Sequence, residues 1–146
     1  MQGNRVQEQM DNAFVNPFVE GVCDFFAMML DSEIHHDSVP SQQACHESQN
    51  GVVASIEMNG WLCAVVELHL PDDTAVALVN RLTGFESKEV DASVLDGVAE
   101  SVNIIAGGAK AKFSRENRPP IDLGLPSVHH GDTGSVSRTG KTKQLE

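Results

Sequence analysis

The amino-acid sequence predicts an α+β domain, in which a small antiparallel sheet has long helices packed on one face. Two observations predict this class. Apolar residues recur at helical spacing in three segments of the chain, and two β-rich runs flank Asn59-Gly60 between the first and second of these segments. The resulting order of helix, hairpin, helix, helix and strand is typical of a sheet that helices cover on one side. A length of 146 residues suits one domain with a single core.

The first predicted helix begins at Asn16-Pro17. Asn16 is a suitable N-cap, and Pro17 at the first helical position lacks an N–H that would have no partner there. We therefore expect residues 1–11 to be a loose polar arm of one domain that spans residues 1–130. The apolar face of this helix ends near Leu30. It consists of Phe18, Val22, Phe25, Phe26 and Met29.

A β-hairpin is predicted around Asn59-Gly60, because β-rich runs on both sides of an Asn-Gly pair are a strong signal for a tight turn. The preceding polar segment, residues 31–50, is expected to be a loop or a weak edge strand. After the hairpin, Pro71 and two acids mark the start of a second helix, where exposed N–H groups and the helix dipole favour negative charge. Gly84 is the expected end of that helix.

A third helix is predicted from about Ser93 to Phe113, with Asp91 or Ser93 as its cap. Its apolar side chains fall on one side of a helical wheel, which must face the core. These are Val94, Leu95, Val98, Val102, Ile105, Ala109 and Phe113. A continuous polar row lies opposite and consists of Asp96, Glu100, Asn103, Gly107 and Lys110.

The end of the chain is predicted to hold one more strand, within residues 123–128, after an extended turn at Pro119-Pro120. Residues 131–146 are rich in Gly, Ser, Thr and Lys. We expect a poorly ordered polar tail there, or an edge element at most.

The polar row of the third helix is the strongest candidate for a functional site. Glu100 and Asn103 lie three residues apart and therefore project side by side. Solvation explains most polar helix faces. Asn is, however, a middling-to-poor helix former, and Gly107-Gly108 costs about 1–2 kcal/mol relative to two alanines. We therefore expect something to approach the backbone closely at this point.

The pattern Asp96-x-x-x-Glu100-x-x-Asn103, continued as Ile-Ile-Ala-Gly-Gly-Ala-Lys, resembles the ExxN helix of the CheC/CheX/FliY family of chemotaxis phosphatases, and CheX most closely. The resemblance covers roughly residues 12–130. Its other landmarks are Phe14-Val15-Asn16-Pro17-Phe18, Pro71-Asp72-Asp73-Thr74-Ala75 and Leu125-Pro126-Ser127-Val128. The chain departs from the family at Gly108, where Asn is frequent, and in its polar tail, where relatives continue with sheet-forming sequence.

The resemblance implies a CheC/CheX-like fold, a homodimer, and hydrolysis of the aspartyl phosphate on a CheY-like response regulator in chemotaxis or a related two-component pathway. It assigns catalytic roles to Glu100, which docks against the regulator's lysine, and to Asn103, which positions a water molecule. Asp96, Gly107 and Lys110 would assist docking. The chain itself would bind no cofactor, and Mg²⁺ would belong to the regulator. A non-catalytic regulator-binding adaptor, a dimeric scaffold and an inactive truncated relative remain alternatives.

Composition and motifs exclude several other classes. Ten Lys and Arg against 21 Asp and Glu give a net charge of −11, which repels nucleic acid and anionic lipid. We find no apolar run of about 20 residues and no signal-peptide pattern, and three cysteines without a CxxC motif fit a reducing compartment. We therefore expect a cytoplasmic protein. The pairs His35-His36 and His129-His130 lack metal-ligand spacing, so no metal site is expected.

Overall fold

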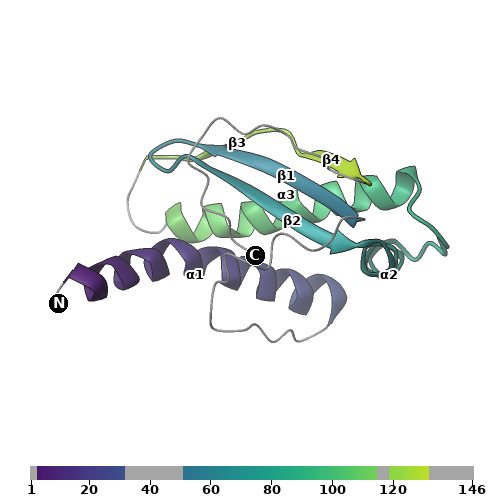
Figure 1. Ribbon diagram of the computed structural model, residues 1–146, viewed down its shortest axis with the longest axis horizontal. Helices are drawn as coiled ribbons and strands as arrows, with labels where there is room; N and C mark the ends of the chain where they lie inside the picture. The colour runs from purple at the N-terminus through teal and green to yellow at the C-terminus, as the bar shows by residue number, and fades with distance from the viewer. Residues whose placement is uncertain (1–2, 32–50, 115–118, 132–146) are drawn as a thin grey trace.

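The computed structural model describes residues 3–31, 51–114 and 119–131. The predicted α+β class is confirmed: three helices pack on one side of an antiparallel sheet (Figure 1). The predictions for residues 32–50 and for the tail from residue 132 lie outside the described part. The elements in chain order are α1 (Gly3–Leu30), β1 (Gly51–Asn59), β2 (Ala64–Pro71), α2 (Asp72–Thr83), α3 (Ala92–Ser114), β3 (Asp122–Leu123) and β4 (Ser127–His130).

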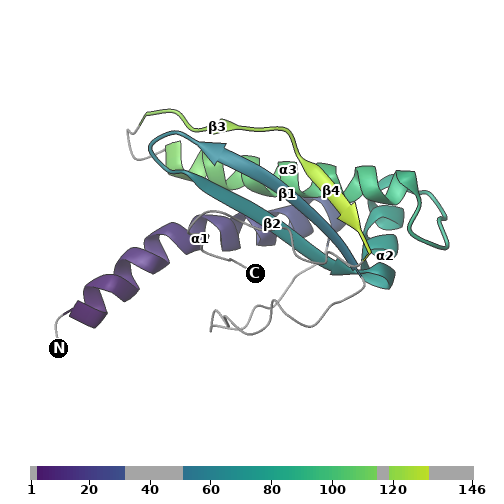
Figure 2. The ribbon, with the colours of Figure 1, turned by 45° about the horizontal axis from the view of Figure 1, so that its top comes forward.

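Strand β1 is the centre of the sheet. It pairs with β2 along one edge, with Met58 opposite Ala64, and with β3 and β4 in succession along the other edge (Figure 2). The predicted hairpin is confirmed, although residues 60–63 replace a two-residue turn. The predicted last strand is divided into β3 and β4. Pro126, which precedes β4, has no N–H to offer a sheet ladder.

The core lies between the inner face of β1 and the apolar side of α3. Alternate residues of β1 are buried, as expected for a strand with one face toward helices, and they contact the face of α3 that the helical spacing predicted. Ser101 of α3 is also buried, and its hydroxyl donates to the carbonyl oxygen of Gly97 at 2.7 Å. The main buried cluster contains Val52, Ala54, Ile56, Ala75, Val79, Val94, Val98, Val102 and Ala106.

Helix α1 is longer than the sequence predicted. It begins at Gly3 and passes through Pro17, so the expected loose arm over residues 1–11 is wrong for residues 3–11, and Asn16 does not start the helix. Residues 4–16 contain no Gly or Pro that would stop a helix. An interior proline removes one backbone hydrogen bond, and the burial of Phe18 and Phe25 after it offsets that loss.

Part of α1 is also more apolar than we expected. The 18 residues Ala13–Leu30 have a mean hydropathy of 1.4 and could cross a membrane by length and composition, so the expectation that no run approaches this length is wrong. One face of the segment packs against α3 and α2 through Phe18, Phe25 and Leu30. A core helix of a soluble protein meets the same criterion, so this single segment is a weak indication of a membrane span.

Helices α1 and α3 cross with their backbones close together. A Cβ added at Gly21 would lie 3.0 Å from the carbonyl oxygen of Ile105, and one added at Gly108 would lie 3.6 Å from the Cα of Gly21. Lys112 of α3 adds an ion pair with Asp24 of α1, at 2.8 Å between Nζ and Oδ2. The hydrogen bond to Asp24 raises the pKa of Lys112. Glycine on both sides thus allows the close approach.

The ends of α2 and the start of α3 agree with the predicted caps. Pro71 precedes α2, and Gly84 ends it in the left-handed conformation at φ 74°. Asp91, not Ser93, caps α3: the N–H of Val94 donates to its Oδ1 at 2.9 Å, and the hydroxyl of Ser87 donates to its Oδ2 at 3.0 Å. These hydrogen bonds, that of Val94 first, hold the pKa of Asp91 below its ordinary value of 3.8.

Asp91→Ala is expected to lower the melting temperature at pH 7 by roughly 2–5 °C, because α3 loses its cap. The folded-state pKa of Asp91 is lowered, so its contribution is fully present above pH 3.8 and is lost as the pH falls through the folded-state value. The difference from wild type should therefore shrink below pH 3.8. Melting curves recorded between pH 7 and pH 2 measure this difference in melting temperature. The control is Asp91→Asn, which keeps a hydrogen-bond acceptor but does not titrate. A difference that is constant over this range would contradict the assignment.

Candidate functional site

The polar row predicted on α3 lies on the outer side of that helix. Asp96 and Glu100 are exposed, and Asn103, Gly107 and Lys110 are partly exposed. The opposite side of the same helix packs against the sheet, and Val98 and Val102 on that side are fully buried. The helix therefore has the orientation that the 3.6-residue period predicts.

Glu100 and Asn103 are available for contacts outside the chain. Among the residues that the structure describes, neither side chain makes a hydrogen bond or an ion pair. Both stand on a 23-residue helix whose other side is fixed in the core. An acid and a carboxamide are thus held one turn apart on a rigid support, and the carboxamide can both donate and accept hydrogen bonds.

The adjacent glycines Gly107 and Gly108 of α3 serve different purposes. We expected something to approach the backbone at Gly107-Gly108, and at Gly108 it is α1 of the same chain, through Gly21. A Cβ added at Gly107 would meet nothing within 4 Å of the described atoms. Gly107 therefore leaves backbone open beside the polar row. Within the described part of the chain, no ion pair engages Lys110, whereas Lys112 is paired with Asp24 and Glu20.

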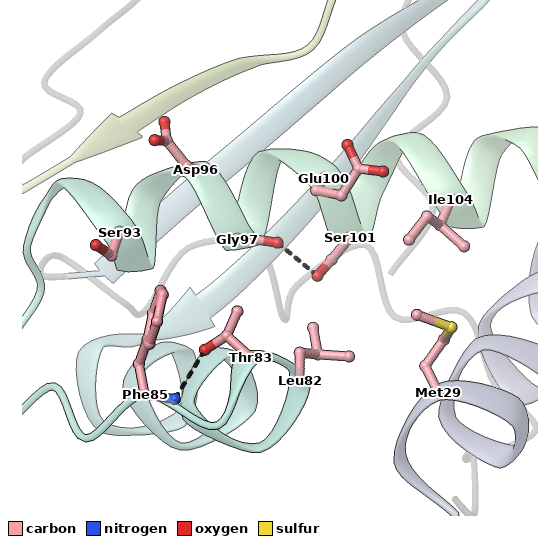
Figure 3. Close-up of a pocket in the computed structure, with 10 residues that line it drawn as sticks. All are labelled: Met29, Leu82, Thr83, Phe85, Ser93, Asp96, Gly97, Glu100, Ser101 and Ile104. Carbon is pink, nitrogen blue, oxygen red and sulfur yellow. Dashed lines mark hydrogen bonds between the residues drawn. The ribbon is translucent and has the colours of Figure 1, made fainter.

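A groove of about 400 Å³ lies next to the polar row, between the ends of α1 and α2 (Figure 3). Sequence analysis did not predict it, because its walls come from separate elements. Asp96 and Glu100 belong to the polar row and also line the groove, but their carboxylates point away from it on the other side of α3 (Figure 3). The sequence signal that could have indicated the groove is Phe85, a large apolar residue directly after the expected helix end at Gly84; in the structure this side chain is exposed. The apolar side chains of the groove are Met29, Leu82, Phe85 and Ile104.

The two histidine pairs of the chain are candidate metal ligands by residue type. Across residues 3–31, 51–114 and 119–131, no group of three or more His, Cys, Asp or Glu side chains gathers. His130 lies against the head of α2, with Nε2 3.1 Å from both carboxylate oxygens of Asp72. The pair His35-His36 falls outside the described residues.

Comparison with known proteins identifies the family. The family model for the chemotaxis phosphatase CheX matches residues 52–146, and the chain belongs to this family. No curated protein sequence matches it. The predicted resemblance is therefore confirmed.

Solved structures share the fold. The chemotaxis protein CheX from Vibrio vulnificus has a TM-score of 0.70 at 20% identity, over 86% of this chain and 80% of that one. CheX in a CheX–CheY–BeF3–Mg²⁺ complex from Borrelia burgdorferi has a TM-score of 0.72 at 20% identity, over 87% and 82%. FliY from Thermotoga maritima has a TM-score of 0.62 at 21% identity, over 83% and 66%.

Proposed function

We propose that this chain accelerates hydrolysis of the aspartyl phosphate on a CheY-like response regulator. The observation that carries the proposal is the placement of Glu100 and Asn103, which project from the outer side of α3 with neither side chain engaged among the described residues. Membership in the CheX family supports it. A structural relative from Borrelia burgdorferi forms a complex with CheY, BeF3 and Mg²⁺, which supports a CheY-like partner.

The regulator supplies much of the chemistry in this proposal. Its acyl phosphate sits beside its own divalent metal and lysine, which neutralise the charge that develops on the phosphoryl group. The reaction still requires a water molecule held in line with the bond that breaks. The carboxamide of Asn103 can donate to such a water and accept from it, which fixes the water's position. Glu100 pairs with the regulator's lysine. The scheme requires no dedicated general base from this chain.

Docking must be locally complementary, because a chain with a net charge of −11 repels an acidic regulator at long range. Lys110 offers a cation at one end of the row, and Asp96 offers an anion at the other. Gly107 lets the partner approach the backbone of α3. The proposal includes a homodimer in the cytoplasm, which sedimentation and cell fractionation would test.

The experiment that tests the proposal measures phosphate release from a CheY-like regulator charged with acetyl phosphate, with and without this chain. We expect faster release in its presence. Equal rates of phosphate release with and without a saturating concentration of the chain would contradict the proposed phosphatase activity. Binding of the regulator without acceleration would instead identify a non-catalytic adaptor.

Glu100→Ala is expected to weaken both docking and turnover, with a loss of about tenfold or more in kcat/KM, because the regulator's lysine loses its partner. Glu100→Lys should cost more, since it places a second cation against that lysine. Phosphate release at several regulator concentrations separates KM from kcat. Glu57→Ala, which removes the same charge from an exposed glutamate of β1, is the matched control. An equal loss in both variants would indicate a general charge effect and contradict the docking role.

A further inference from the structure

We propose that the groove beside Glu100 receives an apolar side chain from the receiver domain of the regulator, so that docking uses an apolar anchor next to the phosphoryl site. This inference rests on the proposed function and names the surface by which the partner is held. The apolar groove residues are Met29, Leu82, Phe85 and Ile104, and Asp96 and Glu100 of the polar row also line the groove.

The groove exposes large apolar side chains that the fold does not need to expose. Met29 at the end of α1 is 49% exposed and Phe85 is 57% exposed, and both face the same depression from opposite ends (Figure 3). Single exposed apolar residues are ordinary on a protein surface. Two of them around one groove of about 400 Å³, together with Leu82 and Ile104, form a contiguous apolar patch that is typical of an interaction site.

The loop that carries Phe85 is held in place before any partner arrives. The N–H of Ser87 donates to Oδ1 of Asn80 at 3.0 Å, and Nδ2 of Asn80 donates to the carbonyl oxygen of Ser87 at 2.8 Å. The N–H of Phe85 itself donates to Oγ1 of Thr83 at 3.2 Å. An anchor site that is already ordered loses less entropy on binding.

The two hydroxyl groups between α2 and α3 in the groove, those of Ser101 and Thr83, are occupied, which disfavours a small polar ligand. The hydroxyl of Ser101 donates to the carbonyl oxygen of Gly97, and that of Thr83 donates to the carbonyl oxygen of Val79, each at 2.7 Å. The carboxylates of Asp96 and Glu100 lie on the other side of α3 from Leu82 and Thr83 (Figure 3). Small-molecule sites have convergent polar groups that orient the ligand, whereas this groove is mainly apolar and the two carboxylates point away from it. It fits an apolar side chain of a larger partner.

Continuity with the polar row points to the regulator as the occupant. Even a weak protein–protein interface buries on the order of 500 Å² on each partner, which is far more than one helical turn at Glu100 and Asn103 can supply. A regulator held at these two residues must therefore extend over the neighbouring surface. The groove is such a neighbouring surface, because Asp96 and Glu100 belong to the polar row and also line the groove. On the outer side of α3, Glu100 pairs with the regulator's lysine in the proposed function.

The test compares Phe85→Ser and Met29→Ser with Met28→Ser. Met28 is the adjacent residue of α1, is 83% exposed and does not line the groove, so it is a matched control. Two quantities are measured: KM and kcat for phosphate release from the charged CheY-like regulator, and Kd for the same receiver domain loaded with beryllofluoride and Mg²⁺. We expect KM and Kd to rise about tenfold for Phe85→Ser and several-fold for Met29→Ser, with kcat within twofold of wild type. Met28→Ser should match wild type, as should the melting temperatures of all three variants.

The outcomes separate this inference from the proposed function. Unchanged Kd and KM in Phe85→Ser and Met29→Ser would overturn the groove as the docking site, while normal turnover by wild type would leave the phosphatase intact. If the wild-type chain binds the receiver without accelerating phosphate release, and Phe85→Ser weakens that binding while Met28→Ser does not, the groove is supported as the docking site and the phosphatase activity is overturned. If Phe85→Ser and Met29→Ser lose self-association in sedimentation but bind the receiver as wild type does, the groove belongs to a second copy of this chain and the inference is overturned. A wild-type chain that binds no receiver would overturn both.

Discussion

Asn103→Ala is expected to slow accelerated phosphate release by about 100-fold or more while the regulator still binds with unchanged affinity. The carboxamide holds the attacking water in line, and even a small misplacement of a reacting group can cost about two orders of magnitude. Alanine is the best helix former, so the substitution does not weaken α3. The loss therefore cannot be attributed to unfolding. Single-turnover phosphate release and a binding titration with the beryllofluoride-loaded receiver measure the two effects separately.

Asn103→Asp is the control that tests the amide itself. It keeps the size and shape of the side chain but accepts hydrogen bonds without donating them when ionised, and it adds negative charge close to the phosphoryl group. We expect turnover nearly as low as in Asn103→Ala. Full activity in either variant would contradict the assigned role of Asn103 and leave Glu100 as a docking residue only.

Gly97→Ala is expected to destabilise the fold by about 2 kcal/mol. A Cβ at this position would lie 2.6 Å from both γ-methyl carbons of Val79 and 3.1 Å from its Cβ. Val79 of α2 is fully buried, and its β-branched side chain has little rotamer freedom with which to move away. The overpacking should exceed the advantage of about 1 kcal/mol that alanine has over glycine within a helix. Equilibrium unfolding in urea measures the change.

Gly107→Ala is the matched control on the same helix. A Cβ there meets no described atom within 4 Å, so the helix-propensity gain should appear undiminished and raise stability by about 0.5–1 kcal/mol. Stabilisation by both substitutions would contradict the tight contact between α2 and α3. If the regulator approaches Gly107 as proposed, this variant should also bind the regulator more weakly than wild type although it is more stable.

Local signals explain which parts of the fold could be predicted. Pro71, Gly84 and Asp91 mark helix ends through the properties of single residues, and the structure places helix boundaries beside each of them. The two faces of α3 follow from its 3.6-residue period, so both the core side and the outward direction of Glu100 were predictable. The Asn-Gly pair located the hairpin, although the length of its connection was not predictable from that pair.

Features that depend on distant segments could not be predicted. A proline after an asparagine is compatible with a helix start and with a tolerated interior position, and only the packing of α1 against α3 distinguishes them. The partner of Gly108 is 87 positions away at Gly21, so the sequence indicated a close approach without indicating what approaches. The groove has the same limitation, because α1, α2, α3 and the loop after α2 each supply part of it.

The crossing of α1 and α3 at Gly21 and Gly108 has a consequence for the way the protein loses activity on heating. The separation between packed helices depends on the side chains at their contact, and at Gly21 and Gly108 no side chain of either residue stands between the two backbones. Amide groups at such a crossing exchange with solvent only when large parts of the molecule open. We therefore expect the polar row on α3 and the end of α1 to melt together with the rest of the fold. Thermal inactivation should follow the same curve as global unfolding.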